Sequence, residues 1–164
     1  MKKFFLVLSL LLSLGTFCAC SNDDETVNVY VPIEEGEDYA AIANFIQSNY
    51  DLGTEHRCFF EDSNERQCLV ISSTNELISR YTGVEAFPDV NFNKYMLIVG
   101  QEMMPSSYHT IQRQELVSKD GDLELNLYIP QLESGYGVVQ HLFYWGLYPK
   151  MQHSKISVTI HKGL

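Results

Sequence analysis

Basic residues are scarce in this sequence. Its 164 residues include 11 lysines and arginines against 21 aspartates and glutamates, a formal net charge of −10 at pH 7. Nucleic-acid binding needs clustered positive charge to contact phosphates, so a nucleic-acid partner is excluded. Several chemical signatures are also missing, because the sequence has no C-x-x-C, H-x-x-E-H, G-x-S-x-G or G-x-G-x-x-G motif. The sequence motifs therefore do not indicate a zinc site, a hydrolase nucleophile elbow or a dinucleotide-binding loop.

The chain also lacks an apolar run long enough to cross a bilayer. The run from Phe4 to Leu14 follows two lysines and carries no charge, but a spanning helix needs roughly twenty such residues. A short apolar segment behind an N-terminal basic pair is typical of a secretory signal. We therefore predict that residues 1–19 form a signal peptide that is removed from the mature protein.

Two cysteines end this segment, and their neighbours distinguish them. The order of residues resembles a bacterial lipoprotein signal, in which cleavage occurs just before a cysteine whose thiol carries a diacylglycerol. Cys20 follows the small residue Ala19, whereas Cys18 follows the bulky Phe17. Because a small residue is favoured before the cut, Cys20 is the predicted lipidation site and would hold the chain at a membrane. The alternative is an ordinary secretory signal with two incidental thiols and a soluble product.

An acidic segment follows Cys20. Residues 21–25 read Ser-Asn-Asp-Asp-Glu, which resembles the export signal that sends Bacteroidota lipoproteins to the outer face of the outer membrane. Such a run is also a well-solvated tether, so a periplasm-facing location is the alternative. We predict an acidic tether over residues 20–37 and an outer membrane lipoprotein that is exposed at the cell surface.

Hydrophobic periodicity predicts two helices followed by strands. In residues 38–53 apolar side chains recur every three or four positions and Gly53 follows as a stop, which is typical of an amphipathic helix. A second, short helix is predicted after Ser73, because Ser73 and Glu76 have capping-box spacing. From residue 93 the pattern is strand-like almost to the end, and Asp120-Gly121 favours a tight hairpin turn between two of these strands.

These elements predict a single α+β domain over residues 38–164. The mature chain is long enough for one hydrophobic core and too short for two comfortable ones. Strands in succession with two helices ahead of them favour a curled antiparallel β-sheet of about six to seven strands, packed by two helices from the N-terminal half. Residues 26–33, with the sequence TVNVYVPI, are predicted to add a short edge strand from the tether.

Lipidation of Cys20 would leave an even pair of cysteines in the mature chain, Cys58 and Cys68. Outside the inner membrane, cysteines pair by default. Residues 61–65 between them are polar and typical of a turn, so we predict that both cysteines lie on adjoining strands of a hairpin and form a disulfide. Closing this loop would contribute roughly 3 kcal/mol to stability. A redox or nucleophilic thiol is the alternative, but the pair lacks C-x-x-C spacing.

From Leu69 onward the order of features resembles a known family. Residues 69–77 read LVISSTNEL, residues 90–102 read VNFNKYMLIVGQE, and PSSYHTIQ, a hairpin and a late YPK follow. Over residues 69–161 this pattern is similar to the C-terminal domain of the protease complex subunit PrcB family. The resemblance implies a small β-rich envelope domain that partners a protease complex, without catalytic residues. One motif departs from the family pattern, because Ser106 and Ser107 replace the two glycines that precede the tyrosine, here Tyr108.

No cluster of chemically active side chains emerges from the pattern. The histidines are spread over separate predicted elements: His56, His109, His141, His153 and His161. Although His141 and His161 alternate with apolar residues on strands, single strand histidines are most often solvent-facing or hydrogen-bonded bystanders. We therefore predict no catalytic residue, no metal ligand and no cofactor, and we do not expect an enzyme.

Aromatic side chains gather in residues 141–148, which read HLFYWGLY. Rings on both faces of one strand cannot all be buried unless the sheet is covered on both sides, so either Phe143 with Trp145, or Leu142 with Tyr144, would be exposed. Exposed rings anchor protein interfaces or stack on sugars, and burial beneath helices is the alternative. The candidate binding residues are Tyr108, Tyr136, Phe143, Tyr144, Trp145 and Tyr148.

The expected function is that of a lipid-anchored, non-enzymatic binding domain of the cell envelope. It would engage a protein partner, for which the family resemblance implies a protease complex. The alternative is a glycan-binding accessory lipoprotein of a polysaccharide-uptake system, which the surface location and the aromatic strand would suit. A scaffold that only spaces other envelope components is a further alternative.

Overall fold

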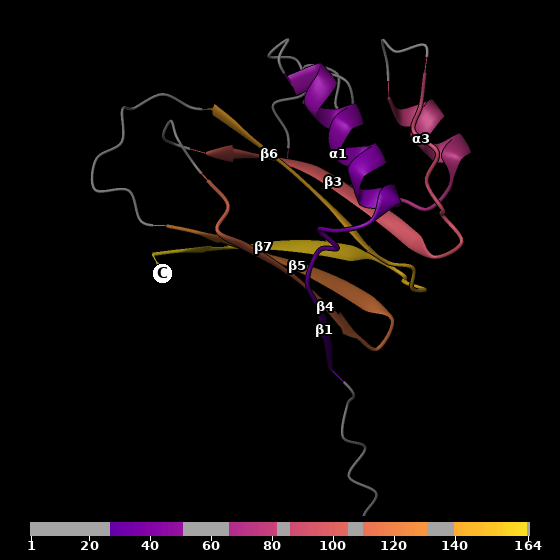
Figure 1. The fold of residues 1–164 in the computed structure, drawn as a ribbon. Coiled ribbons are helices and arrows are strands. Elements are labelled where there is room, and N and C mark those ends of the chain that lie inside the picture. Colours follow the sequence, from indigo (N-terminus) through magenta and orange to yellow (C-terminus); the bar gives the residue numbers. More distant parts are fainter. Residues whose placement is uncertain (1–26, 51–65, 82–85, 105–109, 131–139, 164) are drawn as a thin grey trace, which may run out of the picture.

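The computed structural model describes residues 27–50, 66–81, 86–104, 110–130 and 140–163. In these ranges seven strands form two sheets, and two helices pack against one of the sheets (Figure 1). The four-stranded sheet has the strand order β1-β4-β5-β7, and the three-stranded sheet has the order β2-β3-β6. Neither of the two described helices has the length and apolar character that a membrane crossing requires.

All but one of the strand pairs are antiparallel, the exception being the parallel pair of β5 with β7. In chain order the elements are β1 (Asn28–Tyr30), α1 (Glu37–Tyr50), β2 (Gln67–Ile71), α3 (Thr74–Arg80), β3 (Tyr95–Met104), β4 (Arg113–Lys119), β5 (Asp122–Ile129), β6 (Gln140–Pro149) and β7 (Ile156–Lys162).

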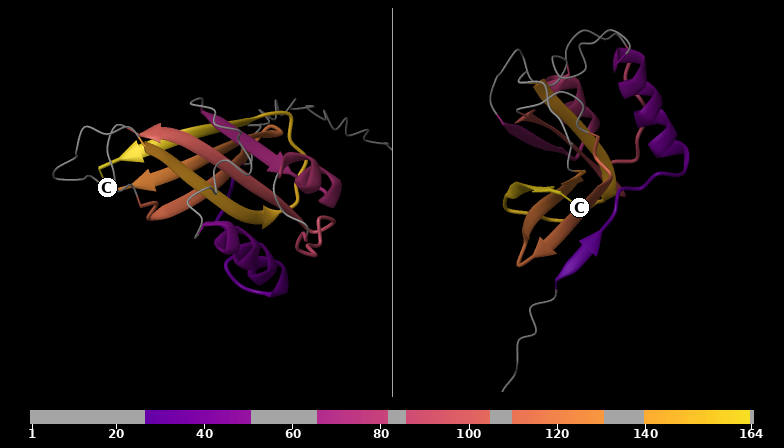
Figure 2. Two further views of the ribbon diagram at one scale, coloured as in Figure 1. Left: turned by 90° about the horizontal axis from the view of Figure 1, so that it is seen from above. Right: turned by 90° about the vertical axis from the view of Figure 1, so that its left-hand side faces the viewer.

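The mostly β architecture with two helices agrees with the sequence, but the strands form two stacked sheets where one curled sheet was expected. The reason is visible in β3, which buries both of its faces. Met96 and Ile98 face the four-stranded sheet, whereas Leu97 and Val99 face the helices. The three-stranded sheet is therefore the middle layer, with α1 and α3 on one side and the four-stranded sheet on the other (Figure 2).

Local signals in the sequence account for two of the element boundaries. Helix α3 begins at the predicted cap, where the Ser73 hydroxyl accepts a hydrogen bond from the Glu76 N–H at 3.1 Å and the Glu76 carboxylate accepts one from the Ser72 N–H at 2.6 Å. The β4–β5 hairpin turns at Asp120 and Gly121, both with positive φ, as a tight two-residue turn requires.

The β1 segment forms the predicted edge strand, and it belongs to the folded body although its residues were assigned to the tether. β1 pairs with β4 at the edge of the four-stranded sheet. Tyr30 packs into the core between the sheets, and the Ile33 N–H donates a hydrogen bond to the Leu147 carbonyl of β6 at 2.8 Å. Residues 28–33 therefore join both sheets along one side of the molecule, and the domain begins before residue 38.

Candidate functional site

The aromatic strand β6 is covered on both faces. Tyr144 and Tyr148 are 2% and 0% exposed in the core between the sheets, where Gly100 and Gly146 leave room for their rings. Burial raises the pKa of both phenols. The expectation that one face of this strand is exposed was therefore wrong for Tyr144, and neither buried tyrosine can contact a partner without opening the core.

On the opposite face of β6, Phe143 and Trp145 are half-buried beside the helix-side core. The Trp145 ring stacks on Tyr39 of α1, with ring centroids 5.7 Å apart. A small groove of about 210 Å³ lies beside these two rings and Gln114. This face of β6 is therefore packed against helix α1, which is the burial expected from the sequence as the alternative to exposure. The other two candidate tyrosines, Tyr108 and Tyr136, lie outside the described residues.

The predicted disulfide is not formed in this structure. Cys68 has a free thiol, while Cys58 lies outside the described residues, as do Cys20 and the signal peptide. The Cys68 side chain points into the core between the sheets, and burial raises the pKa of its thiol to about 11. The only described strand beside β2 is β3. The pairing of Cys58 with Cys68 therefore stays a prediction.

A buried carboxylate lies near Cys68 on the same face of the three-stranded sheet. Glu102 is 2% exposed, and its Oε2 accepts a hydrogen bond from Arg66 Nε at 2.5 Å. Among the described residues its second oxygen, Oε1, has no hydrogen-bond partner. Burial raises the pKa of Glu102, and the hydrogen bond and charge of Arg66 act in the opposite direction. This pair stabilises β2 against β3.

Two of the five histidines, His56 and His109, lie outside the described residues. His141 lies on β6 and His161 on β7, which belong to different sheets. The His161 ring stacks on Tyr128 at 4.6 Å, and its Nε2 lies 2.6 Å from Asn126 Oδ1. Across the described ranges no three His, Cys, Asp or Glu side chains are grouped so that they could hold a metal ion.

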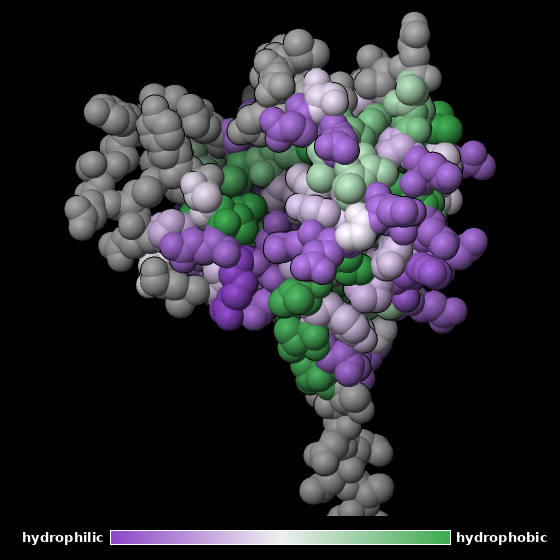
Figure 3. Space-filling view, viewed as in Figure 1, coloured by the Kyte–Doolittle hydropathy of each residue, from purple (hydrophilic) through white to green (hydrophobic). Residues whose placement is uncertain are grey.

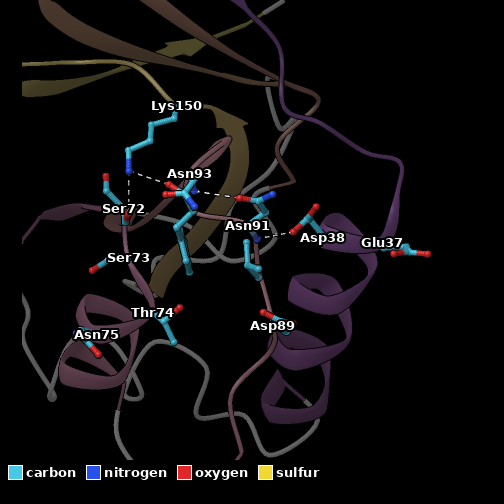
Figure 4. A pocket seen from close by; sticks show the side chains of 12 residues that line it. Glu37, Asp38, Ser72, Ser73, Thr74, Asn75, Asp89, Asn91, Asn93 and Lys150 are labelled. Atoms are coloured by element: carbon cyan, nitrogen blue, oxygen red, sulfur yellow. Dashed lines mark hydrogen bonds between the residues drawn. The ribbon is translucent and has the colours of Figure 1, made fainter.

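A polar pocket of about 740 Å³ opens between the first turns of α1 and α3 (Figure 4). Four separate chain segments line it: the start of α1, the approach to α3 with its first turn, the loop before β3, and Lys150 after β6. Its polar side chains are Glu37, Asp38, Ser72, Ser73, Thr74, Asn75, Asp89, Asn91, Asn93 and Lys150. No signal in the sequence connected these segments, because they meet only in the folded chain.

Hydrogen bonds fix the walls of this pocket. The Asn91 N–H donates to Asp38 Oδ1 at 2.6 Å, which connects the loop before β3 to α1. Lys150 Nζ donates to the Phe92 carbonyl at 2.7 Å and to the Ser72 carbonyl at 3.3 Å (Figure 4). The pocket is therefore held in shape from three sides.

A row of exposed valines marks β1. Val27, Val29 and Val31 are 52%, 56% and 63% exposed, and they form an apolar patch at the lower end of the described part of the molecule (Figure 3). The short edge strand predicted in this segment is confirmed, but the sequence did not show that its valines are exposed. Exposed apolar groups in such a row are typical of an interaction surface.

The backbone of β1 is also open on one side. β1 pairs only with β4, and within the described ranges its other side makes no backbone hydrogen bond to a further strand. Residues 26–33 contain no charged side chain, although natural edge strands are commonly protected from new pairing by charge. At the opposite edge of the sheet, β7 lies close to β2. We call the open edge of β1 with Val27, Val29 and Val31 the β1 edge.

Comparison with known proteins yields no relative: no protein-family model, no curated protein and no solved structure matches this chain. The similarity to the PrcB family therefore remains an expectation drawn from the sequence.

Proposed function

We propose that the protein is a lipid-anchored, non-catalytic binding domain of the outer membrane that engages a protein partner through the β1 edge. The observation that supports this function is the combination of a strand edge that no other described strand pairs with and three exposed valines. A partner that adds an extended segment beside β1 would gain backbone hydrogen bonds along the strand. Its own apolar side chains would cover the valines and supply the specificity.

The position of β1 in the chain favours a partner in the same membrane. Val27 is the seventh residue after Cys20, and seven residues span at most about 25 Å when fully extended. With Cys20 held in the bilayer by its lipid, the β1 edge would lie within reach of the membrane-proximal surface of a neighbouring envelope protein. A protease complex, implied by the resemblance to the PrcB family, is one such partner.

Charged substitutions in the valine row test this function. We expect the full lipidated chain with Val29→Lys and Val31→Lys to lose its partner, because a partner strand would have to bury two ammonium groups. The stability of the domain should change little, since both positions are exposed. The measurement is co-purification from gently solubilised outer membrane, with the bound protein identified by mass spectrometry.

Ile78→Lys provides the matched control, because Ile78 is an exposed apolar residue, at 48%, on α3 and away from β1. This variant should retain the partner. Retention of the partner by the double valine variant, or its equal loss from Ile78→Lys, would contradict the proposed surface.

Membrane attachment through Cys20 has its own test. We expect Cys20→Ala to abolish incorporation of radiolabelled palmitate and to leave an uncut precursor, because the acyl chain is attached at this thiol before cleavage. Cys18→Ala should be labelled and processed as the natural chain is. Normal labelling of the Cys20→Ala chain would contradict this attachment site.

A further inference from the structure

We propose that the polar pocket between α1 and α3 binds a neutral carbohydrate, a ligand whose adjacent hydroxyl groups both donate and accept hydrogen bonds. This site is separate from the β1 edge and does not depend on the proposed protein partner. Its volume of about 740 Å³ falls in the roughly 300–1,000 Å³ range of small-molecule sites.

The side chains that face the pocket match a hydroxyl-rich ligand. Thr74, Asn75 and Asn93 each carry groups that donate and accept, and Asp89 adds two acceptor oxygens. The hydrogen bonds that fix the walls do not engage the side chains of these four residues. They are therefore available to vicinal hydroxyls, which present donor and acceptor at neighbouring carbon atoms.

The charge of the pocket excludes anionic ligands. Glu37, Asp38 and Asp89 bring three carboxylates against the single ammonium of Lys150. A phosphate, a sulfate or an acidic sugar would be repelled by the excess negative charge.

A metal ion is disfavoured for a different reason. Although Asp89, Asn91 and Asn93 alternate as oxygen-bearing residues along the loop, the Lys150 ammonium already bonds the Phe92 carbonyl of that loop at 2.7 Å. A cation bound against the same loop would be repelled by the ammonium group. A neutral ligand that uses hydroxyl groups is left as the best match.

The rigidity of the walls favours binding. The Asp38–Asn91 bond, the two bonds of Lys150 and the Ser73–Glu76 cap hold the pocket before any ligand arrives. A ligand therefore does not have to order these segments when it binds, and less of the gained hydrogen-bond energy is lost as entropy.

The test uses the full chain in detergent micelles and three neutral oligosaccharides, maltohexaose, mannohexaose and cellohexaose, with binding measured by calorimetry. We expect at least one of them to bind. The double variant Thr74→Val/Asn75→Ala should raise its Kd at least tenfold, because it removes the Thr74 hydroxyl without changing the shape of that side chain and removes the carboxamide of Asn75. Thr159→Val, the same chemical change on β7, should leave the Kd unchanged.

Several results would overturn the carbohydrate site. These are no binding of any of the three oligosaccharides at millimolar concentration, binding that the double variant does not weaken, or tighter binding of inorganic phosphate than of the sugars. Unchanged thermal unfolding of the double variant shows that it is folded. The Val29→Lys/Val31→Lys chain should bind the oligosaccharide with unchanged Kd, which keeps this outcome distinct from that of the β1 edge.

Discussion

Gly100→Ala is expected to lower the free energy of unfolding by about 3 kcal/mol, the upper end of the range for overpacking a core. Gly100 lies on β3 directly opposite Tyr144 of β6. The Tyr144 ring covers the glycine so closely that a Cβ there would overlap the phenol. Because Tyr144 is itself buried among the core residues of both sheets, its ring has no free space to move into. The measurement is urea unfolding of the purified domain, followed by circular dichroism.

A double-mutant cycle identifies the cause of this loss. Tyr144→Leu removes the ring and leaves a cavity, so it destabilises the domain by itself. In the combined Gly100→Ala/Tyr144→Leu chain the new methyl group occupies part of that cavity. The combined loss should therefore be clearly smaller than the sum of the two single losses. Additive losses would show that the close approach of Tyr144 to Gly100 is not the source of the effect.

Arg66→Met is expected to cost about 2 kcal/mol of stability at pH 8 and little at pH 4, because it leaves the buried Glu102 carboxylate without its cation. Arg66 directly precedes β2 and lies opposite Glu102, one position beyond the Gln67–Gln101 pair. The Arg66 side chain is itself 62% exposed, so solvent limits the strength of the pair, and the expected loss is lower than for a fully buried ion pair.

The pH dependence follows from the direction of the pKa shift. Burial raises the pKa of Glu102 in the folded chain above its ordinary value of 4.5. Its contribution to stability is therefore fully present below pH 4.5 and is lost as the pH rises through the folded-state pKa. Loss of Arg66 raises the folded-state pKa of Glu102 further, which enlarges the loss of stability at alkaline pH.

Glu102→Gln is the matched control for this prediction, because the amide retains the shape of the side chain without its charge. In that background Arg66→Met should cost little at either pH, and the dependence of stability on Glu102 ionisation should disappear. Urea unfolding at pH 4 and pH 8 measures all four chains. Equal losses from Arg66→Met at both pH values would contradict the role of the carboxylate.

Features of the fold that depend on neighbouring residues could be predicted from the sequence. The cap at Ser73 needs only Glu76 three residues later, and the β4–β5 turn needs only Asp120 and Gly121. The five strands after residue 93 follow from apolar runs and alternation, and the structure forms a strand in each of them. The hydrogen bonds of the cap and the dihedral angles of the turn involve residues that are close in sequence, so the sequence pattern indicates them directly.

The division into two sheets could not be predicted in the same way. β3 is followed in the chain by β4, yet β3 pairs with β2 and β6, while β4 pairs with β1 and β5. Such pairing depends on contacts between distant segments, which periodicity does not encode. The nearly continuous apolar run from Met96 to Val99 was the one signal of a strand buried on both faces. Because β6 pairs with β3 in the same middle sheet, both faces of β6 are covered as well.

The candidate sites were missed for the same physical reason. The aromatic residues of β6 attracted attention because large rings are frequent at interfaces, but here they fill cores on both sides of a middle sheet. The polar pocket combines residues from Glu37 to Lys150, and the Arg66–Glu102 pair requires the register of β2 on β3. The valine alternation of β1 was recognised as strand-like, but its exposure depends on the partner strands of the sheet.

Site-specific photocrosslinking in intact cells tests the proposed protein interface most directly. A photoreactive phenylalanine analogue at Val29 lies on the exposed row of the β1 edge, and the same analogue at Ile78 lies on an exposed site of α3. We predict a discrete adduct with another envelope protein from position 29 and none from position 78. No adduct from position 29, an adduct only with a second copy of this chain, or the same adduct from both positions would contradict the account.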